Sequence, residues 1–226
     1  MGKQRHLRGV LFDLDGTLLD TAPDLVAACN TACLEFGLTP QSQEALRPQI
    51  SGGAPAMLAY TAAANGRELD DFDRLLERML SLYETNIAVH TGFFQGMAEV
   101  LDEVESRGMA WGIVTNKTSR FTDPLLERLG LHTRPGCVIS GDTTAQAKPH
   151  PLPMLEASRR IGSPPEACVY VGDARRDIEA GKNAGMATLA ALYGYIPEDD
   201  PAHEWGADAL LQRPTDILAW LDGELA

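Results

Sequence analysis

The feature that most constrains this chain is an apolar run near its start that ends in two acidic residues and a glycine. Residues 10–12, Val-Leu-Phe, are apolar without alternation, a pattern typical of a strand covered on both faces inside a parallel sheet. Asp13 and Asp15 follow this run, and Gly16 comes next. We therefore expect a buried strand that delivers two carboxyl groups to one edge of a sheet.

The spacing of Asp13 and Asp15 favours one shared pocket. Side chains two residues apart in an extended segment point the same way, and Gly16 lets the backbone turn sharply just beyond them. Two carboxylates this close repel each other unless a cation lies between them. Taken alone, the segment is explained equally well by a hairpin turn at Asp15–Gly16, with Asp13 capping the end of the strand.

Composition describes a globular chain and excludes some partners. The 226 residues are 44% hydrophobic and 23% charged, which is enough for a sizeable core. The net charge of −13 and the pI of about 4.7 argue against nucleic acid or an anionic membrane surface as a partner, because both need a basic surface. A small anionic substrate is still allowed, since local charge decides binding at a site.

The cysteines and the hydropathy pattern predict a cytoplasmic protein. The four cysteines form no Cys-x-x-Cys pair and are expected to be small buried hydrophobic residues in a reducing compartment. Residues 1–20 lack a long apolar core with a cleavage site, and no apolar run approaches membrane-spanning length. Neither export nor membrane insertion is expected.

Residues 22–89 show helical periodicity and no strand signal. In the last part of this stretch, Leu75, Leu76, Met79 and Tyr83 recur at helical spacing among charged residues. The expected helices span about 23–37, 55–64 and 69–89, with a short segment at 44–50 and a glycine loop at 51–53. The pattern predicts a helical domain over 22–89, inserted into a core domain formed by 1–21 and 90–226.

From residue 90 onward, strand and helix patterns alternate, which is typical of a parallel sheet with crossover helices. The expected strands span 109–115, 137–140, 167–171, 187–192 and 207–211. The expected helices span 97–107, 119–129, 151–161, 177–184 and 215–221. The predicted fold class is therefore α/β, with a Rossmann-like parallel sheet and an inserted all-helical cap.

Polar residues gather where these strands end, which is where open parallel sheets bind ligands. The residues in question are Asp13, Asp15, Thr115, Asn116, Lys148, Asp173 and Asp177. Each has an ordinary explanation by itself, as a β-branched strand residue, a turn residue or a surface charge. Together, carboxylates, a hydroxyl group and a lysine at consecutive strand ends favour a metal-assisted phosphoryl-transfer site.

The ordered set of segments resembles the haloacid dehalogenase superfamily of phosphatases. Four motifs match in order: Asp13–Thr17, Thr115, Lys148 and Gly172–Asp177. The resemblance spans nearly the whole chain and looks closest to phosphoglycolate phosphatases. Further segments are similar to N-acetylmuramic acid 6-phosphate phosphatases, namely Ser51–Ala54, Trp111–Lys117, Tyr193–Ile196 and Trp205–Asp208. The resemblance to the superfamily implies that the strand before Asp13 is central in the sheet and that a helical cap lies between the first two motifs.

The resemblance also implies a role for each acidic residue. Asp13 would be the nucleophile that forms an aspartyl-phosphate, and Asp15 would be the general acid and then the general base. Hard oxygen ligands suit Mg²⁺, here a carboxylate of Asp13, the backbone carbonyl of Asp15 and a carboxylate of Asp173. Asp177 would hold a metal-bound water or orient Lys148.

Further residues would bind the substrate. Thr115 and Lys148 would contact the phosphate oxygens, helped by backbone N–H groups near Asn116. Ser51, Gly52 and Gly53 would contact the rest of the substrate, although a plain turn between helices is an equally good interpretation of this loop.

The resulting functional hypothesis is a Mg²⁺-dependent phosphatase acting on 2-phosphoglycolate or N-acetylmuramic acid 6-phosphate. A phosphomutase with the same core and a catalytically silent phosphate-binding homologue are the alternatives. A dehalogenase would need neither Mg²⁺ nor the carboxyl of Asp15, so the presence of Asp15 counts against it.

Overall fold

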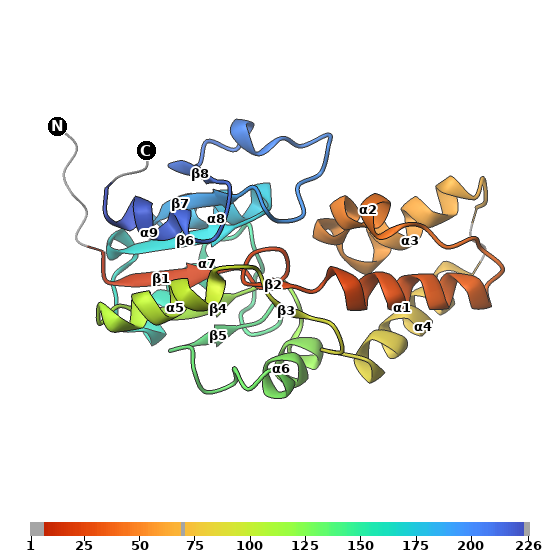
Figure 1. Cartoon of the computed structure of the whole chain (residues 1–226), viewed down its shortest axis with the longest axis horizontal. Helices are drawn as coiled ribbons and strands as arrows, with labels where there is room; N and C mark the ends of the chain where they lie inside the picture. The colour runs from red at the N-terminus through yellow and green to blue at the C-terminus, as the bar shows by residue number, and fades with distance from the viewer. Residues whose placement is uncertain (1–6, 69–70, 224–226) are drawn as a thin grey trace.

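The acidic run near the start of the chain follows the central strand of a sheet. In the computed structural model, which describes residues 7–68 and 71–223, β1 (Gly9–Phe12) pairs in parallel with a strand on each side. All six strands of this sheet are parallel, in the order β5-β4-β1-β6-β7-β8 (Figure 1). The other strands are β4 (Ala110–Val114), β5 (Val138–Ile139), β6 (Cys168–Gly172), β7 (Ala187–Ala191) and β8 (Ala209–Leu211). The predicted α/β class is confirmed.

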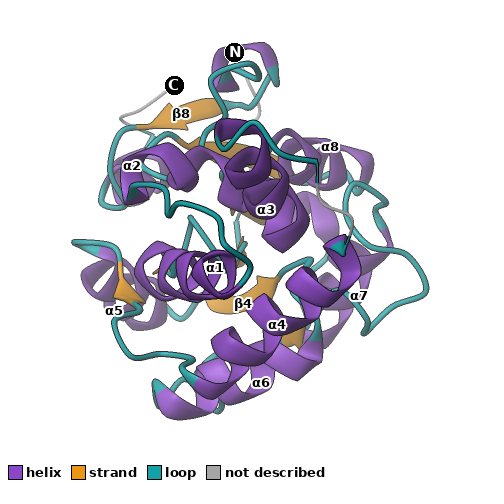
Figure 2. Ribbon diagram, turned by 90° about the vertical axis from the view of Figure 1, so that its right-hand side faces the viewer, coloured by secondary structure: helices purple, strands orange, loops and turns teal. Residues whose placement is uncertain are grey.

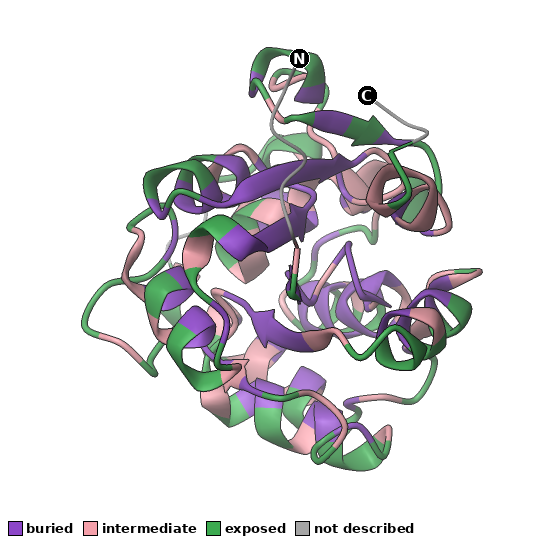
Figure 3. Cartoon of the chain, turned by 90° about the vertical axis from the view of Figure 1, so that its left-hand side faces the viewer, coloured by how far each residue is buried: buried purple, intermediate pink, exposed green. Residues whose placement is uncertain are grey.

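Helices cover both faces of this sheet, so alternate residues of β1 enter different clusters. Val10 and Phe12 pack in one cluster with Val100, whereas Leu11 packs in another with Met154 and with residues of the helix after β6. Figure 3 shows the buried strands between helices whose outer faces are exposed. The helices that connect or follow the later strands of the sheet are α5 (Met97–Ser106), α6 (Ser119–Arg128), α7 (Leu152–Arg160), α8 (Arg175–Asn183) and α9 (Asp216–Leu221). Two short 3-10 helices, η2 (Pro165–Ala167) and η3 (Ala202–Glu204), lie between them.

The predicted helical insertion is also present. It comprises α1 (Ala22–Glu35), α2 (Gln43–Leu46), η1 (Arg47–Gly52), α3 (Gly53–Ala64) and α4 (Phe72–Thr85). These helices lie to one side of the sheet (Figure 1), and Figure 2 looks onto them. The division into domains at residues 21 and 90 stays a prediction. None of the helices in the described ranges is long and apolar enough to cross a membrane.

Some boundaries differ from the predicted ones, and one element was missed. The helix predicted for 69–89 ends at Thr85, and residues 69 and 70 lie outside the described residues. The helix predicted from Asp177 begins at Arg175, because the Asp177 carboxylate accepts the backbone N–H of Ala174 and so caps the helix from its first turn. The short antiparallel pair β2 (Leu19–Asp20) and β3 (Gly92–Phe93) was not predicted, since two residues cannot show a period.

One buried carboxylate ties the two connections between sheet and helices together. Asp24, in the first turn of α1, accepts hydrogen bonds from the backbone N–H of His90 at 2.9 Å and of Thr91 at 3.0 Å. The hydroxyl of Thr91 donates to the same carboxylate at 2.7 Å. The chain therefore leaves the helical region close to the point where it enters it.

We expect Asp24→Ala to lower the free energy of unfolding by roughly 2–3 kcal/mol, because it leaves buried donors of Thr91 without their charged acceptor. Urea denaturation measures this change. Glu84→Gln, which breaks an exposed ion pair with Arg120, is the matched control and should cost less than about 1 kcal/mol. Equal losses in the two variants would contradict the structural role of Asp24.

Candidate active site

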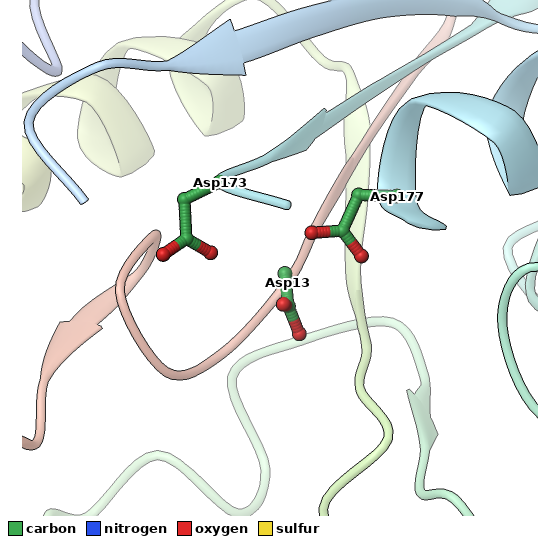
Figure 4. Close-up of side chains that lie close together, drawn as sticks. All are labelled: Asp13, Asp173 and Asp177. Carbon is green, nitrogen blue, oxygen red and sulfur yellow. The ribbon is translucent and has the colours of Figure 1, made fainter. Parts of the chain in front are cut away.

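Three buried carboxylates meet at the carboxyl end of the sheet. Asp13 follows β1, Asp173 follows β6 and Asp177 lies in the first turn of α8. One oxygen of each lies within 4.8 Å of the others, and Figure 4 shows the three side chains converging from these separate elements. Their predicted proximity is thus present in the structure, whereas the roles assigned to them stay predictions.

The position of Asp173 depends on two tight loops. Its Oδ2 accepts the backbone N–H of Tyr195 at 2.7 Å, and its Oδ1 accepts the hydroxyl of Thr17 at 3.2 Å. A Cβ atom at Gly194 would lie 2.4 Å from the Cβ of Asp173, and one at Gly16 would lie 2.0 Å from its Oδ2. Only glycine therefore lets both loops close around this carboxylate.

Burial and the proximity of these acids raise the pKa of Asp173 and of Asp177. Burial raises the pKa of Asp173 to about 8, and Asp13 and Asp177 add to the shift. Burial also raises the pKa of Asp177, with Lys148 opposing the shift and Asp13 adding to it. A divalent cation among these oxygens would remove the repulsion and favour the ionised forms. The donor set, oxygen atoms alone, therefore fits a hard divalent metal ion.

Lys148 lies beneath this cluster as its buried counter-charge. Its Nζ is 2.9 Å from Oδ1 of Asp13 and 2.7 Å from Oδ1 of Asp177. The same ammonium group donates to the hydroxyl of Tyr170 at 2.8 Å and to the carbonyl of Val114 at 3.0 Å. Lys148 thus fixes the two carboxylates, while its predicted contact with a phosphate stays a prediction.

The side chain of Asn116 binds the backbone of Lys148. Its side-chain amide donates to the carbonyl of Lys148 and accepts the backbone N–H of Lys148, both at 3.0 Å. Asn116 and Thr115 also line the cavity described below. The side chain of Asn116 is therefore a positioning group for the Lys148 loop, and a substrate contact by this residue stays a prediction.

The carboxylate of Asp15 lines the same cavity as Asp13 but is not part of the three-acid cluster and has its own partners. It accepts the hydroxyl of Thr21 at 2.6 Å, and the Nζ of Lys117 lies 2.9 and 3.0 Å from its two oxygens. Burial alone lowers the pKa of Lys117, but Asp15 and Tyr83 outweigh it and leave the pKa raised. Lys117 was missed as a site residue, although its place two residues after Thr115 at a strand end was a usable signal.

A cavity of about 540 Å³ opens between the sheet and the helical region. Its floor carries Asp13, Asp15 and Thr115. Ser51–Gly53 form part of its wall, but the prediction of a loop there is wrong, because Ser51 and Gly52 end η1 and Gly53 begins α3. The helical side is largely apolar, with Leu25, Ile50, Met57, Leu76, Leu80 and Tyr83. The cavity therefore joins an acidic floor to an apolar wall that an organic group can contact.

Tyr195 connects the acidic cluster to the entry of the helical region. The sequence resemblance included its segment, Tyr193–Ile196, but assigned Tyr195 no role at the site. Its backbone N–H holds Asp173, while its hydroxyl accepts the N–H groups of Thr21 and Ala22 at 2.8 and 2.9 Å and donates to Asp20 at 2.8 Å. Its carbonyl accepts the hydroxyl of Ser51 at 2.7 Å. One residue thus contacts the acidic cluster, the start of α1 and Ser51 in η1.

Comparison with known proteins gives a consistent result. Residues 10–191 match the family of haloacid dehalogenase-like hydrolases. An N-acetylmuramic acid 6-phosphate phosphatase of Pseudomonas putida is 44% identical over 221 residues, covering 97% of this chain and 98% of the relative. A phosphoglycolate phosphatase of Xanthomonas campestris pv. campestris is 44% identical over 222 residues, covering 96% and 98%.

A solved structure has the same fold. The crystal structure of a predicted phosphoglycolate phosphatase from Haemophilus somnus superposes with a TM-score of 0.83 at 26% identity, covering 96% of this chain and 98% of that one. The sheet with its helical insertion is therefore shared with solved relatives.

The raised pKa of Asp173 predicts a pH dependence of stability in metal-free protein. Between the ordinary value of 3.8 and the folded value of about 8, the folded state binds more protons than the unfolded state. The contribution of Asp173 to the free energy of unfolding therefore falls as pH rises through this window. Asp173→Asn removes the effect, so the variant should gain stability relative to the unmodified protein between pH 5 and pH 8.

Urea denaturation in EDTA at several pH values measures this difference. Added Mg²⁺ should reverse the stability advantage of Asp173→Asn, because the ion stabilises the ionised cluster of the unmodified protein and not that of the variant. A stability difference between the two proteins that does not change with pH would contradict a raised pKa of Asp173.

Proposed function

Because this chain belongs to the haloacid dehalogenase-like hydrolases and is a phosphatase of small phosphorylated metabolites, we propose that it hydrolyses N-acetylmuramic acid 6-phosphate with Mg²⁺. The observation that carries this choice is the cavity of about 540 Å³ with its apolar helical wall. Such a volume is in the usual range for a ligand the size of a substituted sugar. 2-Phosphoglycolate is the second candidate, supported by the phosphatases of that name among the relatives.

Asp13 is the proposed nucleophile. Its Oδ1 accepts the backbone N–H of Leu14 at 2.7 Å and lies against Lys148, so these contacts orient the carboxylate at the cavity floor. An oxygen of Asp13 forms a bond to phosphorus while the bond from phosphorus to the sugar oxygen breaks. The product of this first step is an aspartyl-phosphate, which divides one difficult displacement into two easier ones.

Asp15 is the proposed general acid and base. It gives a proton to the departing sugar oxygen and then takes one from the water that hydrolyses the aspartyl-phosphate, which releases inorganic phosphate and restores Asp13. Thr21 and Lys117 hold its carboxyl group beside the floor of the cavity. Asp15 is adjacent to the nucleophile but outside the three-acid cluster, and this position suits a group that transfers protons.

Mg²⁺ is the proposed metal ion, held by Asp13, Asp173 and the backbone carbonyl of Asp15, with Asp177 acting through Lys148 or a water molecule. When bound, the ion would draw charge from the phosphate oxygens. Thr115 and Lys148 are the proposed phosphate contacts.

The four cysteines are free and buried, which agrees with the proposal that the protein works in the reducing cytoplasm.

We expect the protein to release inorganic phosphate from N-acetylmuramic acid 6-phosphate with a higher kcat/KM than from 2-phosphoglycolate. Activity should disappear in EDTA and return with Mg²⁺. The reverse preference would transfer the assignment to 2-phosphoglycolate. Isomerised sugar phosphate without phosphate release would support a phosphomutase, and no turnover of any phosphate ester would support a silent homologue.

Two substitutions separate the proposed roles of the first two acids. Asp13→Asn removes the attacking carboxylate and should leave almost no activity. Asp15→Asn retains the backbone carbonyl but loses the proton carrier, so turnover should fall by about 10²–10⁴-fold, with the Mg²⁺ concentration for half-maximal activity roughly unchanged. Steady-state kinetics and rapid-quench detection of phosphoprotein measure both effects. Unchanged turnover in either variant would reject the corresponding role.

A further inference from the structure

Arg176 is a cavity residue to which the mechanism above gives no task. It lies in the first turn of α8, between the cluster acid Asp177 and the surface residue Arg175, and its side chain lines the cavity. Its Nη1 donates to the carbonyl of Ser51 at 2.7 Å. The guanidinium therefore extends from the sheet side to Ser51 in η1.

Arg176 differs from the other cation of the cavity wall in its partners. Lys117 contacts both oxygens of Asp15, so its charge is already matched. Within residues 7–68 and 71–223, no carboxylate forms an ion pair with Arg176. Its Nε is shielded from solvent and has no acceptor among the same residues.

A half-buried guanidinium with unused donors is costly unless a ligand accepts from it. The planar group presents parallel N–H donors that match the two oxygens of a carboxylate. Because the helical wall of this cavity is apolar, a second anionic group on a substrate would find few other partners there. Burial lowers the pKa of Arg176, but the nearby charges of Asp177, Asp13 and Asp173 outweigh it and leave the pKa raised, so the guanidinium stays charged at the edge of the acidic cluster.

We propose that Arg176 determines substrate specificity by binding a carboxylate that the substrate carries in addition to its phosphate. The inference rests on the proposed function only in that the substrate is a phosphate monoester with such a group. Both candidate substrates have one, on the lactyl ether of the sugar or on the two-carbon acid. Arg176 thus accounts for selection of carboxylated phosphate esters over neutral ones.

The test compares substrates that differ by the carboxylate. N-Acetylglucosamine 6-phosphate lacks the lactyl group of N-acetylmuramic acid 6-phosphate, and 2-hydroxyethyl phosphate lacks the carboxylate of 2-phosphoglycolate. For each pair, kcat/KM of the carboxylated compound is divided by that of its neutral partner, in Mg²⁺-containing buffer. In Arg176→Gln this ratio should fall about 10- to 100-fold, mainly through KM of the carboxylated compound.

Two further variants make the test specific. Arg176→Lys keeps the charge but not the paired donors, so its ratio should lie between those of the unmodified protein and Arg176→Gln. Arg175→Gln removes an equal charge one residue away, from a side chain paired with Asp200 on the surface, and should leave the ratio unchanged. Circular dichroism and thermal unfolding confirm that the variants are folded.

The outcomes separate this inference from the proposed function. A preference for 2-phosphoglycolate would overturn the substrate assignment, while a fall in the ratio of the second pair would still support Arg176. Equal losses for carboxylated and neutral substrates would overturn the inference, because they place Arg176 on the phosphate or in the support of the acids. It would also be overturned if the unmodified protein did not discriminate within either pair.

Discussion

The repulsion among three buried carboxylates is the constraint on which this structure depends. Asp13, Asp173 and Asp177 come from three positions along the chain, and the parallel sheet brings them to one edge. Lys148, enclosed beneath them, matches part of their charge. A cluster of this kind is poorly stable alone, since each buried charge disfavours the others. The three buried carboxylates therefore suit a divalent cation, whose charge would offset their mutual repulsion.

Tyr195 explains how such a site can be connected to a separate group of helices. Its backbone N–H binds a carboxylate of the cluster, its hydroxyl binds the start of α1, and its carbonyl binds the side chain of Ser51 in η1. Because these three contacts belong to one residue, Tyr195 connects the helical region to the acidic cluster directly.

Much of this architecture could be predicted from the sequence, because periodicity and strand ends are local signals. The apolar runs gave the sheet, and the acids after residues 12 and 172 marked its binding edge. Lys117, Arg176 and Tyr195 could not be assigned in the same way. Lys117 meets Asp15 across 102 residues, and Tyr195 meets Asp20 across 175, so these partners depend on how distant loops beside the sheet fold together, which no local pattern shows. The strand pair β2–β3 was too short to have a pattern.

The cavity has walls from two different parts of the chain, and this has an evolutionary consequence. The acids and lysines of the proposed phosphate site come from the sheet side, whereas the apolar part of the cavity wall comes from α1, α3, α4 and η1. Substitutions in those helices can change which alcohol fits without disturbing the reacting atoms. A lineage with this arrangement can therefore acquire new substrates by drift in one segment while selection preserves the other, and overall identity becomes a poor guide to the metabolite each descendant consumes.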